Sequence, residues 1–303
     1  MVSIAAVAFF AGGCAVSHKT AAKPSQTLGT VLTATREQLI ERYNRLADAI
    51  QTVNAGVAMK LISGSAYSGV IEQYHEVNGF ILAAKPSNIR VIGQAPVIAT
   101  NIFDMVSDGK TFEISIPSKH RFVVGPVNVT RQSAKPIENL RPQHLIDALL
   151  WFPLSPRLLA VFEESSESNV RYYVLTIIRP LAGSDSSDVT YTAGSNLEIA
   201  EKIWFERSDL HISRVENFSN GGIVDSDVRY SDWQPAGERT YPRQIDIARL
   251  REDYQLQIHI NKLTLNESVG DDRFKLEQPP GSDLVQVSAD GSEKTIAPAK
   301  EPQ

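Results

Sequence analysis

The sequence predicts a mainly β protein: one antiparallel sheet of about 9–11 strands, with an N-terminal helix and a short helical lid. Two observations lead to this fold class. From Gly56 onward, apolar and polar residues alternate in many short runs separated by turn residues. Two other segments instead repeat apolar residues every three or four positions, which is the period of a helix. A helix with a strongly apolar face needs a concave sheet surface to pack against.

The first helical segment is "TREQLIERYNRLADAIQTV", residues 35–53. Thr35 with Gln38 three residues later forms a capping-box pattern, which marks a helix N-terminus. The apolar side chains of the segment are spaced by three and four, so they form one stripe. They are Leu39, Tyr43, Leu46, Ile50 and Val53. We expect this helix to pack by one face.

Strands are predicted by the two-residue period. "TFEISIP" (111–117) and "YQLQIHIN" (254–261) alternate apolar and polar residues, which is typical of strands with one buried face. "VRYYVLTIIRP" (170–180) is apolar on both faces, so we expect a strand covered on both sides. "NGG" at 220–222 lies between two strand-like runs and predicts a hairpin.

The second helical segment is "RPQHLIDALLWF", residues 141–152, with Pro142 in its first turn. Leu145, Leu149 and Phe152 recur at helical spacing. We expect these three side chains to cover the concave face of the sheet as a plug or lid.

Composition and charge limit the function. The chain has 303 residues and a net charge of −5, so no basic surface indicates a nucleic-acid partner. We expect one domain at 33–280, because no Pro/Gly-rich break and no repeat divides it. Residues 281–303 are mostly polar, and we expect a disordered tail there.

The N-terminus contains the single cysteine of the chain, Cys14, in "FFAGGCAVSHKT". Residues 1–13 are short and uncharged, as in the apolar core of a secretory signal peptide. Residues 11–14, "AGGC", resemble a bacterial lipobox, which implies that Cys14 carries diacylglycerol after the leader is removed. A polar tether at 14–32 follows. The alternative is an apolar start that packs, with Cys14 as a small buried residue.

Motifs for catalysis are absent from the sequence. The six histidines are scattered and have no metal-ligand spacing. There is no GxSxG elbow, P-loop or GxGxxG. We therefore expect no enzyme activity, no catalytic or metal-binding residues and no cofactor.

Residues 79–117 and the closing stretch "DDRFKLEQPPGSDLVQV" resemble the LolA/LolB-type family of lipoprotein carriers. The family pattern is a Gly-led strand ending in a basic residue and Pro, another strand, a Pro, and a strand leading into a tight turn. The matching positions are Gly79, Lys85-Pro86, Pro96 and "SDGK" at 107–110. The resemblance covers about two-thirds of the domain and implies a half-barrel whose helices enclose an apolar cavity for acyl chains.

The cavity candidates come from strand faces and the lid. They are Ile81, Ala83, Lys85, Ile89, Val91, Leu145, Leu149, Tyr254, Leu256 and Ile258. Alternation alone does not distinguish a lipid cavity from a filled core, so both remain open. In the soluble carriers an Arg at the position of Lys85 helps couple the lid to ligand release. Lys lacks the planar geometry of Arg, so we expect a solvated lysine at a strand end rather than a switch.

The functional expectation is a monomeric lipoprotein of the bacterial envelope, anchored in the outer membrane and facing the periplasm. It would bind lipid, or the acyl chains of other lipoproteins, and assist their transport or insertion. The alternative is an anchored structural, interaction or sensor module that uses the same fold without a transported ligand. The sequence identifies no protein partner.

Overall fold

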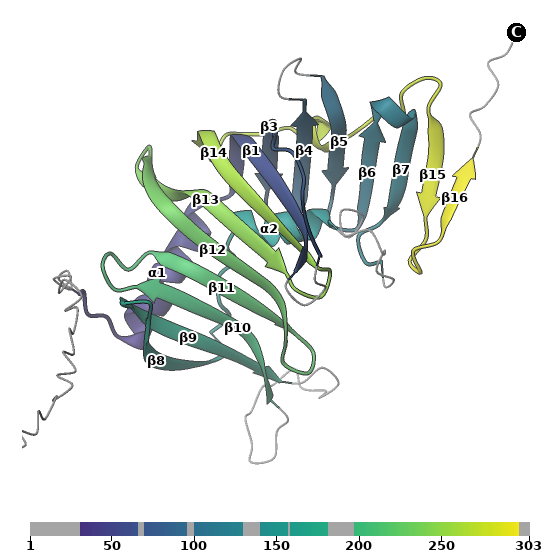
Figure 1. Cartoon of the computed structure of the whole chain (residues 1–303). Coiled ribbons are helices and arrows are strands. Elements are labelled where there is room, and N and C mark those ends of the chain that lie inside the picture. The colour runs from purple at the N-terminus through teal and green to yellow at the C-terminus, as the bar shows by residue number, and fades with distance from the viewer. Residues whose placement is uncertain are drawn as a thin grey trace, which may run out of the picture.

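The computed structural model describes residues 31–65, 70–95, 100–129, 140–156, 158–180 and 197–296. Within these residues, a single sheet of 16 strands forms the body of the protein. The sheet curves without closing, and helices α1 (Arg36–Ala49) and α2 (Pro142–Leu149) lie on its concave side (Figure 1). The predicted half-barrel is therefore confirmed.

The strands before α2 are β1 (Thr52–Ser65), β2 (Val70–Gln73), β3 (Val77–Ala84), β4 (Asn88–Gln94), β5 (Asn101–Ser107), β6 (Thr111–Ile116) and β7 (Arg121–Pro126). Those after it are β8 (Leu159–Glu167), β9 (Val170–Pro180), β10 (Leu197–Glu206), β11 (Ile212–Ser219), β12 (Ile223–Ala236), β13 (Arg239–Arg249), β14 (Tyr254–Leu265), β15 (Asp283–Val287) and β16 (Glu293–Ile296). Short 3-10 turns occur at Pro117–Lys119 and Asp271–Phe274.

The two halves of the sheet meet at β1. The strand order is β16-β15-β7-β6-β5-β4-β3-β1-β14-β13-β12-β11-β10-β9-β8, and β2 pairs with β1 off this path. β1 pairs with β3 on one side, where Val53 faces Ala83, and with β14 on the other, where Val53 faces Leu265. The hairpin predicted at 220–222 joins β11 to β12, and Gly221 and Gly222 have the positive φ that such a turn requires.

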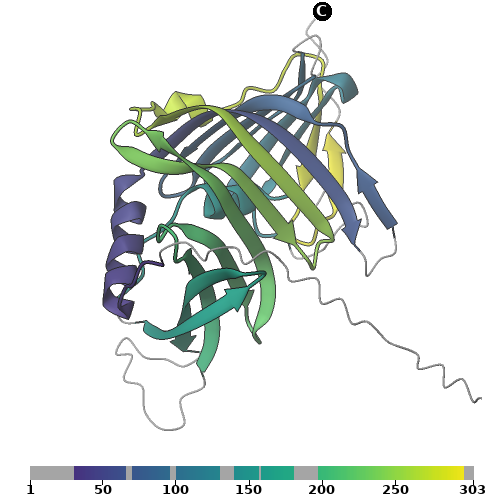
Figure 2. The same ribbon diagram turned by 60° about the vertical axis from the view of Figure 1, so that its left-hand side comes forward.

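Helix α1 begins as the sequence predicts. Thr35 and Gln38 form the reciprocal capping box, with the Thr35 amide donating to Gln38 Oε1 over 2.8 Å. The buried side of the helix contains Leu39, Tyr43 and Ala47. Figure 2 shows α1 beside the half of the sheet that contains β8–β13. The apolar stripe thus positions α1 against the later strands.

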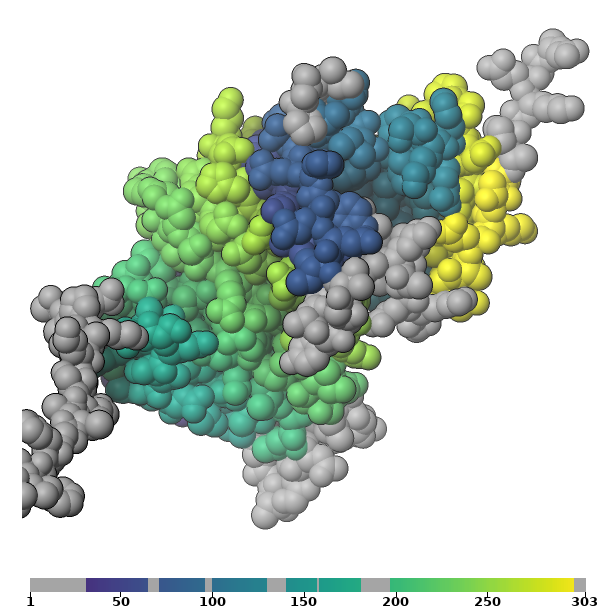
Figure 3. All heavy atoms as spheres, in the orientation of Figure 1, coloured from purple at the N-terminus to yellow at the C-terminus, as the bar shows by residue number. Residues whose placement is uncertain are grey.

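Helix α2 lies inside the curve of the sheet. Leu145, Ile146 and Leu149 are fully buried in the main core. The Tyr241 hydroxyl of β13 donates to the Leu149 carbonyl over 2.7 Å, so one of the unpaired carbonyls at the helix end has a partner. From the outer side of the sheet, the strands hide most of both helices (Figure 3).

Two expectations about the sheet need correction. It has more strands than the 9–11 predicted, and it is mixed, because β15 pairs with β7 in parallel. Residues 281–303 were expected to be a disordered tail, yet 283–287 and 293–296 form β15 and β16. The reason is that Val285 is buried against the sheet and Arg121 of β7 pairs with Glu293 at 2.8 Å. The polar composition of this segment predicted disorder, because these few contacts leave no pattern in the sequence.

Candidate functional site

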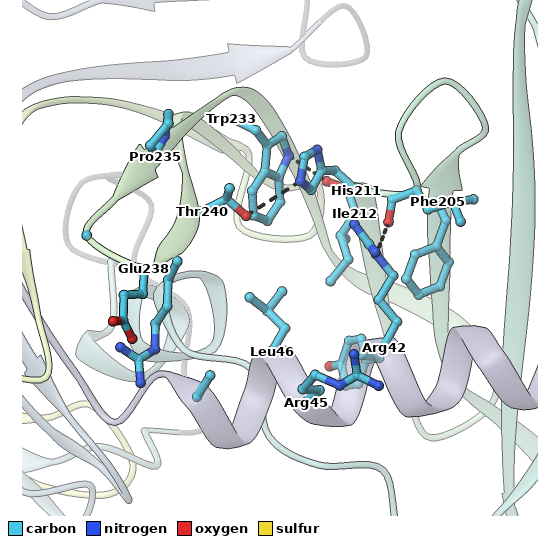
Figure 4. A pocket seen from close by; sticks show the side chains of 15 residues that line it. Arg42, Arg45, Leu46, Phe205, His211, Ile212, Trp233, Pro235, Glu238 and Thr240 are labelled. Atoms are coloured by element: carbon cyan, nitrogen blue, oxygen red, sulfur yellow. Dashed lines mark hydrogen bonds between the residues drawn. The ribbon is translucent and has the colours of Figure 1, made fainter. Parts of the chain in front are cut away.

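A cavity of about 470 Å³ lies between α1 and the hairpins at the ends of β10–β13 (Figure 4). Fifteen residues line it. They are Arg42, Tyr43, Arg45, Leu46, Ala49, Phe205, Leu210, His211, Ile212, Trp233, Pro235, Gly237, Glu238, Arg239 and Thr240. The volume lies in the range of small-molecule sites in proteins.

The interior of the cavity is apolar. Phe205 and Ile212 are buried, and Leu46 of α1 points between the helix and the hairpins. The Trp233 ring stacks on His211 with 4.7 Å between centroids, and its indole nitrogen donates to the Ile212 carbonyl over 3.1 Å. These contacts hold a flat aromatic wall beside the aliphatic side chains.

The opening of the cavity carries charge. Arg42, Arg45 and Arg239 are exposed, and Glu238 is the acidic residue among the lining side chains. Arg42 donates to the backbone carbonyls of Leu210 (2.7 Å) and Asp209 (3.2 Å), so it joins α1 to the turn between β10 and β11. Carbonyls accept these hydrogen bonds without cancelling the guanidinium charge.

A polar contact lies next to the cavity on the inner face of β10. The Tyr43 hydroxyl donates to Glu201 Oε1 over 3.4 Å. Removal from water raises the pKa of Glu201 to about 7; the hydrogen bond from Tyr43 opposes this shift, and the charge of Asp147 on α2 adds to it. Glu201 is therefore a carboxyl group that titrates near neutral pH.

A second polar contact joins α2 to the sheet. His144 Nδ1 lies 2.7 Å from the Tyr254 hydroxyl. Burial lowers the pKa of His144 to about 3, and the charges of Arg249 and Arg141 act in the same direction. His144 is neutral at physiological pH, so its hydrogen bond with the Tyr254 hydroxyl joins two uncharged groups.

Nine of the ten predicted cavity residues are buried in the main core. They are Ile81, Ala83, Ile89, Val91, Leu145, Leu149, Tyr254, Leu256 and Ile258. All nine belong to one hydrophobic core of the described residues, together with side chains of α1, and none of them lines the cavity under α1. Phe152, the third residue expected in the lid, is 38% exposed.

Lys85 is not a solvated strand-end lysine. It is half-buried, and its ammonium donates to the Ala47 carbonyl in the last turn of α1. The same ammonium lies 5.1 Å from the centre of the Phe152 ring. Burial lowers the pKa of Lys85, while the charge of Asp48 partly compensates. Lys85 thus joins the end of β3 to both helical segments, because the C-terminal carbonyls of a helix attract a cation.

Several predicted features lie outside the described residues: Cys14, the signal peptide at 1–13, most of the tether, and Pro96. Sequence patterns missed the cavity residues of the hairpins. Arg42 and Arg45 lie beside the apolar stripe of α1, and no sequence motif marks them as site residues. Trp233 follows the second strand-like run after "NGG", and its position there was the one available signal.

In the described part of the chain, no helix has the length and apolar character needed to cross a membrane. None of the His, Cys, Asp and Glu side chains in that part of the chain gather in a group that could hold a metal ion.

The fold and the site together define the structural class of the protein. It is a curved open sheet with helices on its concave side and an apolar cavity with a cationic opening. No protein-family model and no curated protein matches the sequence. Among solved structures, the chain is similar to a DUF1329 family protein from Desulfovibrio piger, with a TM-score of 0.50 and 12% identity over 78% of this chain and 94% of that one. This similarity shows a shared fold.

Two further solved structures are similar over most of their lengths. A LolA superfamily protein from Nitrosomonas europaea has a TM-score of 0.46 and 13% identity, over 80% of this chain and 99% of that one. A protein described as an outer membrane lipoprotein-sorting domain, from Vibrio parahaemolyticus, has a TM-score of 0.46 and 10% identity, over 78% and 94%. The architecture that the LolA/LolB resemblance predicts, a half-barrel with helices on its concave side, is the one observed.

Proposed function

We propose that the protein is a lipoprotein of the bacterial envelope that binds acyl chains in the cavity under α1 and assists their transport or insertion. The curved-sheet fold supports this proposal, as does the sequence resemblance to lipoprotein carriers. On the same proposal, Cys14 carries the lipid that anchors the protein in the outer membrane.

The observation that carries the proposal is the apolar interior of the cavity. Leu46, Phe205, Ile212 and Trp233 present aliphatic and aromatic surface in a space of about 470 Å³. An acyl chain needs only apolar surface and a suitable shape, because the hydrophobic effect has no direction. Each methylene removed from water contributes about 0.8 kcal/mol. Bilayers offer a similar gain, so moderate affinity suffices for exchange with a membrane.

Displacement of a fluorescent fatty acid from the purified protein tests acyl binding. Leu46→Trp places a larger side chain in the cavity and is expected to weaken binding about tenfold, by taking the space of the ligand. The matched control is Ile223→Trp, because Ile223 is 52% exposed at the start of β12 and does not line the cavity. Absence of saturable binding by the wild type, or equal binding by the two variants, would contradict the proposal.

Intact-mass analysis of protein from membranes tests the anchor. Cys14→Ser is expected to leave the leader attached and the residue without lipid. Two acyl chains give stable attachment, at about 0.8 kcal/mol per buried methylene. An unmodified Cys14 in the wild type would rule out the lipid anchor without affecting the acyl-binding test.

One observation favours the alternative, an anchored interaction or sensor module without a transported ligand. Nine of the ten residues predicted to line an acyl cavity are instead buried in the main hydrophobic core, including Leu145 and Leu149. A module that only presents a surface needs no cavity, so core residues at these positions suit it. Mass spectrometry of lipid co-purifying with the protein separates the two functions: bound lipid supports the carrier, and its consistent absence supports the module.

A further inference from the structure

The distribution of charge around the cavity under α1 contains information about its ligand. This inference rests on the proposed function, since it concerns the same cavity. We propose that the cavity selects amphiphiles with an anionic head, a carboxylate or a phosphate, over neutral ones.

The first argument is the sign of the charge. Three arginines and one glutamate line the cavity, whereas the chain as a whole has a net charge of −5. A cationic opening on an acidic protein attracts anions locally and leaves the remaining surface unattractive to them. Apolar binding alone does not require this arrangement.

The second argument is the order of polar and apolar groups. Arg42, Arg45 and Arg239 are exposed, while Phe205 and Ile212 deeper in the cavity are buried. An amphiphile has the same order, with an apolar chain at one end and a polar head at the other. A chain that enters the cavity would leave its head at the arginines.

The third argument is that the arginines come from opposite sides of the opening. Arg45 belongs to α1, and Arg239 is the first residue of β13. Its neighbour Glu238 lies on the hairpin that faces the helix in Figure 4. The planar guanidinium forms paired hydrogen bonds with carboxylate and phosphate oxygens. Arg45 contacts Glu41 in an exposed ion pair, which is weak enough to exchange for a ligand.

The experiment compares four probes of equal chain length on the purified full chain: dodecanoate, dodecyl phosphate, dodecanol and dodecyltrimethylammonium. Each displaces the same fluorescent fatty acid, and inorganic phosphate serves as a head without a chain. We expect the two anions to bind at least fivefold more tightly than dodecanol, with the difference decreasing as salt is added. We expect inorganic phosphate to displace nothing.

The double variant Arg45→Gln, Arg239→Gln tests the source of the preference. It should lose most of the difference between dodecanoate and dodecanol while keeping its affinity for dodecanol. Arg42 stays unchanged, because its hydrogen bonds hold the turn at 209–210. Arg251→Gln, in the turn between β13 and β14, removes an exposed arginine outside the lining and should keep the preference.

The outcomes separate this inference from the proposed function. If no probe binds, acyl binding itself fails. Equal affinity for dodecanol and dodecanoate leaves acyl binding intact and overturns the selectivity. A preference that survives in the double variant overturns the role of these arginines, and displacement by inorganic phosphate alone would indicate a site for free anions rather than amphiphiles.

Discussion

Glu201 is a carboxyl group on an otherwise apolar inner face of β10, followed there by the buried Ile203 and Phe205. Its neighbour across the helix–sheet contact is Tyr43, which also lines the cavity. Protonation of Glu201 therefore takes place where α1 meets the sheet. This single residue links pH to the packing of the helix that covers the cavity.

Glu201→Gln is predicted to change how stability depends on pH. The raised pKa of about 7 means that the folded protein binds more protons than the unfolded chain between about pH 4.5 and 7. Wild-type stability should thus decrease as the pH rises through this interval, and the amide should remove that decrease. We expect the variant to be more stable at pH 8 by about 1–3 kcal/mol, and equal at pH 4.

Urea unfolding at several pH values measures this difference. Glu163→Gln is the control, since Glu163 lies on the exposed face of the edge strand β8. A constant difference between Glu201→Gln and wild type across the pH range would show that Glu201 has an ordinary pKa.

Lys85→Met is predicted to destabilise the protein by about 1–3 kcal/mol, the usual contribution of a hydrogen bond to a charged group. The apolar stem is retained, so the loss reports the contact of the ammonium with the Ala47 carbonyl and the Phe152 ring. Thermal unfolding provides the measurement. Lys110→Met, in the exposed turn before β6, should have little effect on the melting temperature. Equal decreases in melting temperature for both variants would show that Lys85 behaves as a solvated lysine.

Among the elements, α2 shows where a prediction from helical spacing succeeds and where it fails. Helical spacing correctly predicted that Leu145 and Leu149 face the sheet. The same spacing placed Phe152 in the lid, but the helix ends at Leu149 and Phe152 lies beyond it, half exposed. Periodicity gives the direction of a side chain only while the helix continues.

Leu149→Asp is predicted to destabilise the protein by about 4 kcal/mol or more, because it places a charge without a partner in the core. Phe152→Asp is the comparison, with an expected loss below about 1 kcal/mol, since surface changes have small effects. Denaturant unfolding of both variants checks the difference. A Leu149→Asp protein as stable as wild type would mean that α2 does not fill the concave face.

At the scale of the whole molecule, alternation and turn residues were sufficient to predict one antiparallel sheet, and helical spacing predicted its N-terminal helix. The open curvature of the sheet came from the resemblance to the LolA/LolB-type carriers. These patterns were insufficient for the cavity, because its lining comes from α1 and from hairpins near residues 210 and 237, which no local pattern brings together. The strand count was too low for a similar reason. Short strands such as β2 and β16 contain four residues each and show no clear period.

Removal of residues 283–303 is predicted to lower the melting temperature and to promote aggregation. The truncation deletes β15 and β16, exposes the backbone edge of β7, and removes the buried Val285. The expected loss is about 2–4 kcal/mol, mainly from apolar surface returned to water. Removal of 297–303 alone leaves both strands and should have no effect. Light scattering and thermal unfolding compare the two, and identical behaviour would show that β15 and β16 do not contribute to stability.

The pairing of β1 with β14 also constrains how the protein acquires its shape. These strands are far apart in the chain, yet their ladder from Val53–Leu265 to Ser63–Tyr254 joins the two halves of the sheet. Contacts between distant segments form slowly, because a long loop must close first. During synthesis, the edge of β1 that pairs with β14 therefore stays unpaired until β14 has left the ribosome. A factor that shields an unpaired strand in the interval would increase the yield of folded protein more than one that acts on local hairpins.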